Sequence, residues 1–134
     1  MKLDLKEAPK LKEIHTKGRP GYRLSAIKLV FEGGLETPFF DSNNDQAKVV
    51  KVVDVQDINI TEIHINTGGP YVSKLLFKTS SGDKLIFDNG YHREGHDLVT
   101  EVPEGYVIVG VHGRYGDSSD GNLLRIPGFI VMKK

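Results

Sequence analysis

Short runs in which apolar and polar residues alternate dominate the chain, and almost none of it has the 3.6-residue period of an amphipathic helix. The clearest alternating runs are residues 58–65, 72–79 and 106–111. Residues that favour turns follow such runs, as at Ser81-Gly82-Asp83 and Pro103-Glu104-Gly105. Residues 46–55 are rich in β-branched valine, which favours a strand over a helical turn. The pattern predicts an all-β fold.

Length and charge limit the organisation and the partners of the chain. A chain of 134 residues fits one domain, residues 1–134, that can bury roughly two thirds of its unfolded surface. Because 18 basic and 18 acidic residues balance, no net field recruits nucleic acid or an anionic membrane. No cysteine is present, which excludes disulfide bonds and thiol chemistry. The apolar runs are too short to cross a bilayer and residues 1–6 lack a secretory apolar segment, so we expect a cytoplasmic protein or an excised domain.

A weak internal repeat bears on the architecture. Residues 28–31 and 74–77 share a kernel of lysine, two apolar residues and phenylalanine, with Phe31 and Phe77 46 residues apart. A poorer third copy around Phe129 follows 52 residues after Phe77. Three strand-rich units of similar length imply a pseudo-threefold fold, a β-trefoil or a β-prism, and the long strands favour the prism.

The candidate binding motif is a Gly-x-x-x-Asp segment that directly follows a strand, from Gly116 to Asp120. Glycine lets the backbone turn where a side chain would clash, and the aspartate can return a carboxylate toward amides in the same turn. A fixed carboxylate beside free N–H groups suits a ligand with adjacent hydroxyls, such as a sugar. The alternative is a solvated hairpin loop, because loops rich in Gly, Asp and Ser are common.

Two runs together resemble a known family. Residues 71–79 and the run 106–116, which ends in Gly113-Arg114-Tyr115-Gly116, are similar to the C-terminal half of jacalin-related lectins. The resemblance is specific in that half and looser before about residue 58. It implies a β-prism in which three four-stranded antiparallel sheets pack around a common core, with the final strand completing a sheet begun by the N-terminal segment.

The resemblance also implies a sugar site. Gly116 would shape it, the backbone amides of Asp117 and Ser118 would donate to ligand hydroxyls, Asp120 would accept from two hydroxyls, and Tyr115 would offer an apolar face. Two features depart from the family. The Gly-Gly loop that completes the family's pocket has no counterpart in residues 4–9, and residues 121–125 are inserted after the aspartate, where we expect a longer loop.

Metal sites are weakly supported by the sequence. His92 and His96 would share a face of a helix, but the neighbouring glycines and the strand-rich context argue against a helix there. Residues 41–45 resemble the start of a calcium loop and lack its later glycine and glutamate. Because these motifs are incomplete, we expect no resident metal or other cofactor. The alternative is calcium held jointly by Asp117, Asp120 and Asn122.

Enzymatic motifs are missing from the sequence. No nucleophile elbow or phosphate-cradling glycine loop is present, and two carboxylates three residues apart in one loop lack the opposed geometry of a glycosidase. We expect a carbohydrate-binding domain without catalytic residues. The alternative is a protein-interaction or membrane-targeting module of the same fold that has lost sugar binding, which should expose an apolar patch on a sheet face. The family resemblance also allows a homodimer formed through outer sheet faces.

Overall fold

The computed structural model describes residues 8–18, 24–37, 49–67, 72–88, 96–118 and 121–134. Apart from one short 3-10 turn, η1 (Glu32–Gly34), the regular elements in these ranges are strands. The strands are β1 (Leu11–Gly18), β2 (Leu24–Phe31), β3 (Val49–Asp54), β4 (Ile60–Thr67), β5 (Val72–Thr79), β6 (Lys84–Asp88), β7 (His96–Glu101), β8 (Tyr106–Ser118) and β9 (Gly121–Lys133). Within the described ranges there is no helix long and apolar enough to cross a membrane. The all-β prediction is confirmed, including the strand expected in residues 46–55.

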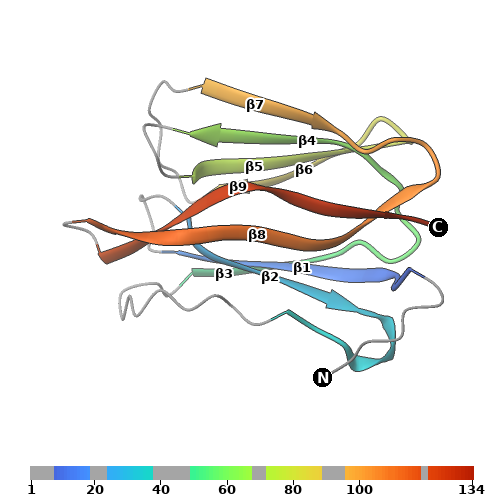
Figure 1. Ribbon diagram of the computed structural model, residues 1–134, viewed down its shortest axis with the longest axis horizontal. Helices are drawn as coiled ribbons and strands as arrows, with labels where there is room; N and C mark the ends of the chain where they lie inside the picture. The colour runs from blue at the N-terminus through green and yellow to red at the C-terminus, as the bar shows by residue number, and fades with distance from the viewer. Residues whose placement is uncertain (1–7, 19–23, 38–48, 68–71, 89–95, 119–120) are drawn as a thin grey trace.

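The strands form three antiparallel sheets (Figure 1), with the orders β2-β1-β3, β6-β5-β4-β7 and β8-β9. Among the described residues the second sheet alone has the expected four strands. The first sheet carries a remnant of a fourth, because Glu36 forms an isolated bridge with Val30. Thr37 fixes that bridge, donating its N–H to the carbonyl of Leu29 at 2.9 Å and accepting the N–H of Leu29 on its hydroxyl at 2.9 Å.

A pseudo-threefold repeat of one hairpin organises the sheets. At the centre of each hairpin an apolar residue buried in the first strand pairs with an apolar residue of the second. The pairs are Ile14 with Leu29, Ile63 with Phe77, and Val111 with Phe129. Phe129 is thus the counterpart of Phe77, as its spacing predicted. In the first hairpin the counterpart of Phe77 is Leu29. The lysine-to-phenylalanine kernel aligned Phe31 with Phe77 instead, and this alignment is wrong by two residues.

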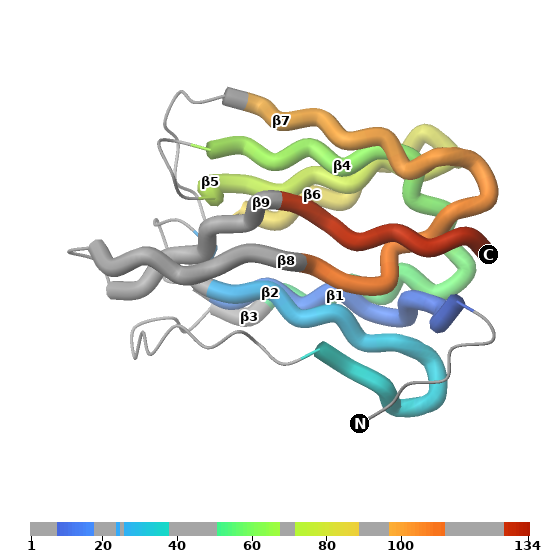
Figure 2. The backbone as a smooth tube through the Cα atoms, viewed as in Figure 1, coloured from blue at the N-terminus to red at the C-terminus, as the bar shows by residue number. Residues whose placement is uncertain are grey.

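The core lies where the inner faces of the three sheets meet. Alternation along β4 and β5 turns Ile63, Ile65, Leu75 and Phe77 inward, each at most 2% exposed. Strand β9 contacts both β2 and β5, and Figure 2 shows its C-terminal part lying between the first and second sheets. Each large apolar side chain buried in this way contributes about 1.5–3 kcal/mol. The core therefore holds the three sheets together and fixes the directions in which their ends point.

Candidate functional site

Four of the predicted binding residues lie at the end of β8. Tyr115, Gly116, Asp117 and Ser118 pair with residues 124 to 121 of β9, so they belong to a hairpin ladder. Asp120 lies outside the described residues. Residues 121–125 were expected to lengthen the loop, and this expectation is wrong because they form the first part of β9. The extra residues lengthen the strand, since each of them from Gly121 to Arg125 has a pairing partner in β8.

The ladder geometry leaves backbone donors near this end. In an antiparallel pair, N–H groups point alternately toward the partner strand and away from it. In the described residues β8 and β9 pair only with each other, so each has one open edge. About half of the amides in residues 116–118 therefore point away from the ladder. A free loop would offer more free amides than this ladder does, but the ladder fixes the direction of those that point outward.

The hairpin tip marks one end of the prism, which we call the hairpin end. The register places Gly18 beside Leu24 and Val49 in the first sheet, and Thr67 beside Val72 and His96 in the second. Figure 1 shows these strand ends on the same side as the tip of β8 and β9. The turns at residues 32–35, 55–59, 80–83 and 102–105 lie at the opposite end, the basal end. A strand of 13 residues separates the two ends by roughly 40 Å.

Other sequence candidates fall largely outside the described residues. Residues 41–45, which were considered for a calcium site, are among them, as is His92. His96 is the first residue of β7. In the part of the chain that the structure describes, no three His, Cys, Asp or Glu side chains gather as a metal site requires.

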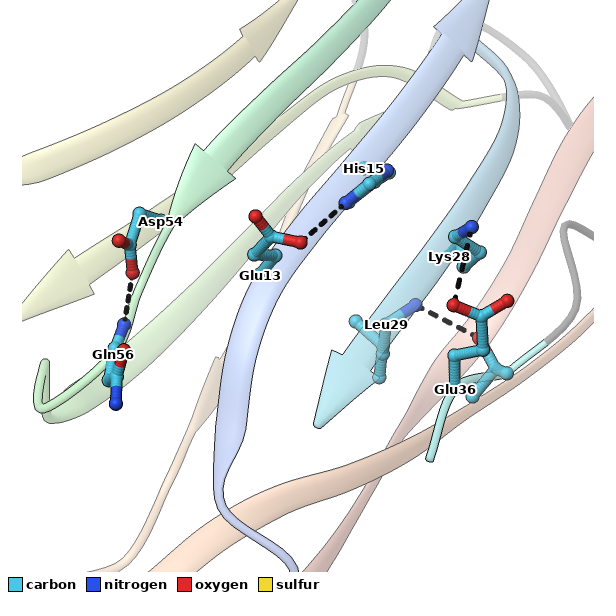
Figure 3. A network of polar contacts seen from close by, with 8 residues as sticks. Glu13, His15, Lys28, Leu29, Glu36, Asp54 and Gln56 are labelled. Carbon is cyan, nitrogen blue, oxygen red and sulfur yellow. Dashed lines mark hydrogen bonds and ion pairs between the residues drawn. The ribbon is translucent and has the colours of Figure 1, made fainter. Parts of the chain in front are cut away.

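Two glutamate–histidine pairs on the outer sheet faces were missed by the sequence analysis. His15 Nε2 lies 3.2 Å from Glu13 Oε1 in β1, and His64 Nε2 lies 3.6 Å from Glu62 Oε1 in β4. Figure 3 shows the first pair beside the ion pair of Lys28 with Glu36, whose Nζ and Oε2 are 3.6 Å apart. Alternation puts residues two apart on one face. The signal was a repeated Glu-Ile-His tripeptide, 49 residues apart.

The outer face of the second sheet carries an apolar row between two polar rows. The register sets four side chains side by side across the strands, namely Ile86, Leu76, His64 and Val99. Ile86 is 41% and Val99 53% exposed. On one side of the apolar row lie Lys84, Lys78, Glu62 and Glu101, and on the other Asp88, Lys74, Asn66 and Asp97. This face carries the kind of apolar patch expected of an interaction module.

A cavity of about 210 Å³ opens at the basal end. Five chain segments line it: the start of β1, the turn after β2, the β3–β4 connection with the first residue of β4, the start of β8, and Lys134. Its lining residues are Lys10, Leu11, Glu32, Asp57, Ile58, Asn59, Ile60, Tyr106, Val107, Ile108 and Lys134. It lies away from all the predicted site residues.

The fold is shared with solved proteins. A mannose-binding jacalin-related lectin from Ananas comosus matches all of this chain over 89% of its own length, with a TM-score of 0.68 and 17% identity. Artocarpin in complex with methyl α-mannose matches 93% of the chain over 85% of its own, with a TM-score of 0.65 and 18% identity. PirB matches 98% of the chain with a TM-score of 0.71 and 12% identity, and the chain spans 31% of its length.

Sequence comparison adds no relative. No protein-family model matches the chain, and no curated protein matches it. The likeness therefore lies in the arrangement of the strands, and it establishes the architecture: the fold is the β-prism of the jacalin-related lectins. Two of the similar structures, from Ananas comosus and champedak, are mannose-binding lectins, in agreement with the resemblance in residues 71–79 and 106–116.

Proposed function

We propose that this protein binds carbohydrate at the hairpin end, through residues 115–120. In the proposed site, whichever of the Asp117 and Ser118 amides points away from the ladder donates to a ligand hydroxyl, the carboxylate of Asp120 accepts from two hydroxyls, and Tyr115 supports one face of the ring. Gly116 leaves room for the ligand beside the backbone. Binding involves no chemical step, so the site needs no nucleophile and no general base.

The observation that carries the proposal is the position of the motif within this fold. Relatives with the same architecture include a mannose-binding lectin and artocarpin in complex with methyl α-mannose. In this chain the glycine that opens the Gly-x-x-x-Asp motif lies two residues before the end of the 13-residue strand β8, where outward amides remain at the ladder edge. A polar ligand beside this end of the ladder would meet donors whose direction the strand pairing sets, which reduces the entropic cost of binding.

Titration calorimetry with methyl glycosides of mannose, glucose and galactose tests the proposal. We expect the unmodified protein to bind at least one of them and Asp120→Ala to bind at least tenfold more weakly, because charge-assisted hydrogen bonds are lost. Asp97→Ala is the matched control, since Asp97 is an exposed carboxylate near the start of β7 and contacts only Asn66 among the described residues, at 2.8 Å. Loss of binding in both variants, or in neither, would contradict the proposed site. Titrations with and without calcium decide whether a cation at Asp117, Asp120 and Asn122 takes part.

A second function, self-association, is favoured by the apolar row of the second sheet. A two-fold axis parallel to the strands would stack the row on its copy, with Ile86 over Val99 and Leu76 over His64. The same axis sets Lys84 opposite Glu101 and Lys78 opposite Glu62. It also leaves Asp88 facing Asp97 at the margin of the face, where solvent and salt screen the repulsion.

Light scattering after size exclusion tests this association. We expect a dimer at high protein concentration and a monomer for Ile86→Lys, because a lysine in the row would be buried without a partner carboxylate. Lys84→Glu with Glu101→Lys exchanges the signs of one facing pair and should keep the dimer. A monomer at every concentration, or a dimer that survives Ile86→Lys, would contradict this interface.

A further inference from the structure

The cavity at the basal end is lined by chain segments that sequence separates and the fold brings together. Its deepest part is apolar, because Ile60 and Ile108 are 8% and 3% exposed and belong to the core. Leu11 and Tyr106 are partly buried and pack against the same core. The floor and one aromatic wall of the cavity are therefore held in place by the packing that holds the sheets together.

The rim of the cavity is polar and its backbone is fixed by hydrogen bonds. The N–H of Glu32 donates to the carbonyl of Lys10 at 2.9 Å, and the N–H of Lys134 donates to Gly105 at 2.8 Å. The carbonyl of Asn59 accepts from the N–H of Ser80 at 2.9 Å, which fixes the backbone at this residue. The backbone that carries these side chains is set before any ligand arrives.

One rim residue adopts an unusual backbone conformation. Asp57 has φ of 63°, and it is the one residue other than glycine in the described ranges with positive φ. Aspartate tolerates this left-handed region better than most residues. The conformation lies in the β3–β4 connection and places Asp57 on the cavity rim next to Ile58, which is 39% exposed.

The charges on the rim balance. Lys10 and Lys134 contribute two cations, and Glu32 and Asp57 contribute two carboxylates. Glu32 Oε1 also accepts a hydrogen bond from Gln56 Nε2 at 3.1 Å. A rim with donors and acceptors but no net charge favours a neutral ligand with many hydroxyls over an anion or a cation. The apolar floor favours a ligand that also has an apolar face.

We propose that this cavity is a second carbohydrate site, which takes one neutral sugar ring. Its volume of about 210 Å³ is smaller than the roughly 300–1,000 Å³ typical of sites for drug-sized ligands, and it suits a single ring. The C–H face of the ring packs against Tyr106 and Ile58, hydroxyls donate to Asp57 and Glu32, and Asn59 both donates and accepts. The proposal extends the proposed function to a second, separate site.

Two sites at opposite ends would change how the protein meets glycans. The first and last residues of β8 lie roughly 40 Å apart, with Tyr106 at the cavity and Ser118 at the hairpin end. One chain with a site at each end could bridge two glycans without forming a dimer. Because the two sites face opposite directions, such bridging would cross-link two separate glycan-bearing molecules or surfaces.

Backbone amide NMR during titration with methyl α-mannoside, methyl α-glucoside and methyl β-galactoside tests this site separately from the first. We expect at least one sugar to shift the amides of Asn59 and Val107, in addition to those near Gly116. Combining Asp57→Gly with Asn59→Ala should weaken the basal response at least tenfold and leave the hairpin response unchanged. Glycine accepts the φ of residue 57, and the backbone bond of Asn59 to Ser80 remains, so this variant should fold.

Glu104→Gln is the matched control, because it removes an exposed carboxylate from the basal end outside the cavity lining. It should leave both responses unchanged. Shifts near Gly116 alone would overturn the basal site and leave the proposed function standing. Shifts at the basal end alone would support the basal site and contradict the hairpin site. The absence of any shift with all three sugars would overturn both, and a basal response equally weakened by Glu104→Gln would overturn the assigned contacts.

Discussion

Phe77 of β5 and Phe129 of β9 meet edge to face, with ring centroids 5.6 Å apart and an interplanar angle of 81°. On its other side Phe77 meets Phe87 of β6 in the same manner, at 5.7 Å and 88°. Phe77 has no exposed surface. The contact joins the second sheet to the β8–β9 hairpin, so the hairpin that carries the proposed sugar site is anchored through this ring.

Removing the Phe77 ring should destabilise the whole domain. We expect Phe77→Ala to lower the free energy of unfolding by about 3–5 kcal/mol through the cavity and the lost edge contacts. Phe77→Leu should cost about 1–2.5 kcal/mol and remain folded. Urea denaturation measures both. Leu35→Ala, at a residue 37% exposed, is the control and should change stability by less than about 0.5 kcal/mol.

Alanine should destabilise the protein at one glycine, Gly105, and change its stability little at another, Gly110. Gly105 has φ of 84° in the turn before β8, and no atom lies within 4 Å of where a Cβ would be. Gly105→Ala should therefore cost about 1–2 kcal/mol from backbone strain alone. At Gly110 a Cβ would meet the Cδ1 of Ile130 at 3.3 Å, and Ile130 is exposed enough for its tip to move. Thermal denaturation should show Gly110→Ala within about 0.5 kcal/mol of the parent, because the lost chain entropy of glycine offsets the contact.

The two repeated histidines should also differ. His64 Nε2 is buried without a hydrogen-bond partner among the described residues, and its neighbours across the strands are Leu76 and Val99. His64→Leu should raise the free energy of unfolding by about 1 kcal/mol, since it removes a buried nitrogen that lies 3.6 Å from Glu62 Oε1 without a hydrogen bond and extends the apolar row.

His15→Leu provides the matched comparison at the equivalent position of the first sheet. His15 Nε2 and Glu13 Oε1 are 3.2 Å apart, within hydrogen-bonding distance. Losing this contact should lower the free energy of unfolding by about 0.5–1 kcal/mol. Parallel urea titrations compare the two variants, and equal effects of the same sign would contradict the difference assigned to the two environments.

Much of the fold could be predicted because apolar and polar residues alternate along the strands, which shows which side chains face the core. Runs such as residues 73–79 bury every second side chain, and the spacing of Phe77 and Phe129 reflected a real equivalence. Register is harder to predict. The kernel around Phe31 was aligned two residues away from its true counterpart. A shift of two residues keeps the same side chains on the inner face, so only the strand pairing distinguishes the two alignments.

The sites were less accessible to sequence reasoning. Residues 121–125 were expected to form loop because they are inserted relative to the family that the chain resembles, yet pairing with β8 extends the strand through them. The basal cavity combines residues 10–11, 32, 57–60, 106–108 and 134. No local motif indicates such a cavity, because it depends on which turns the prism brings to one end.

A crystal structure of the protein grown with methyl α-mannoside, or with the best ligand from calorimetry, tests the central claim most directly. The account predicts ordered sugar density at the hairpin end, with ring hydroxyls within about 3 Å of the Asp120 carboxylate and of backbone amides in residues 116–118. Sugar bound elsewhere, with this end empty at saturating ligand, would contradict the proposed site.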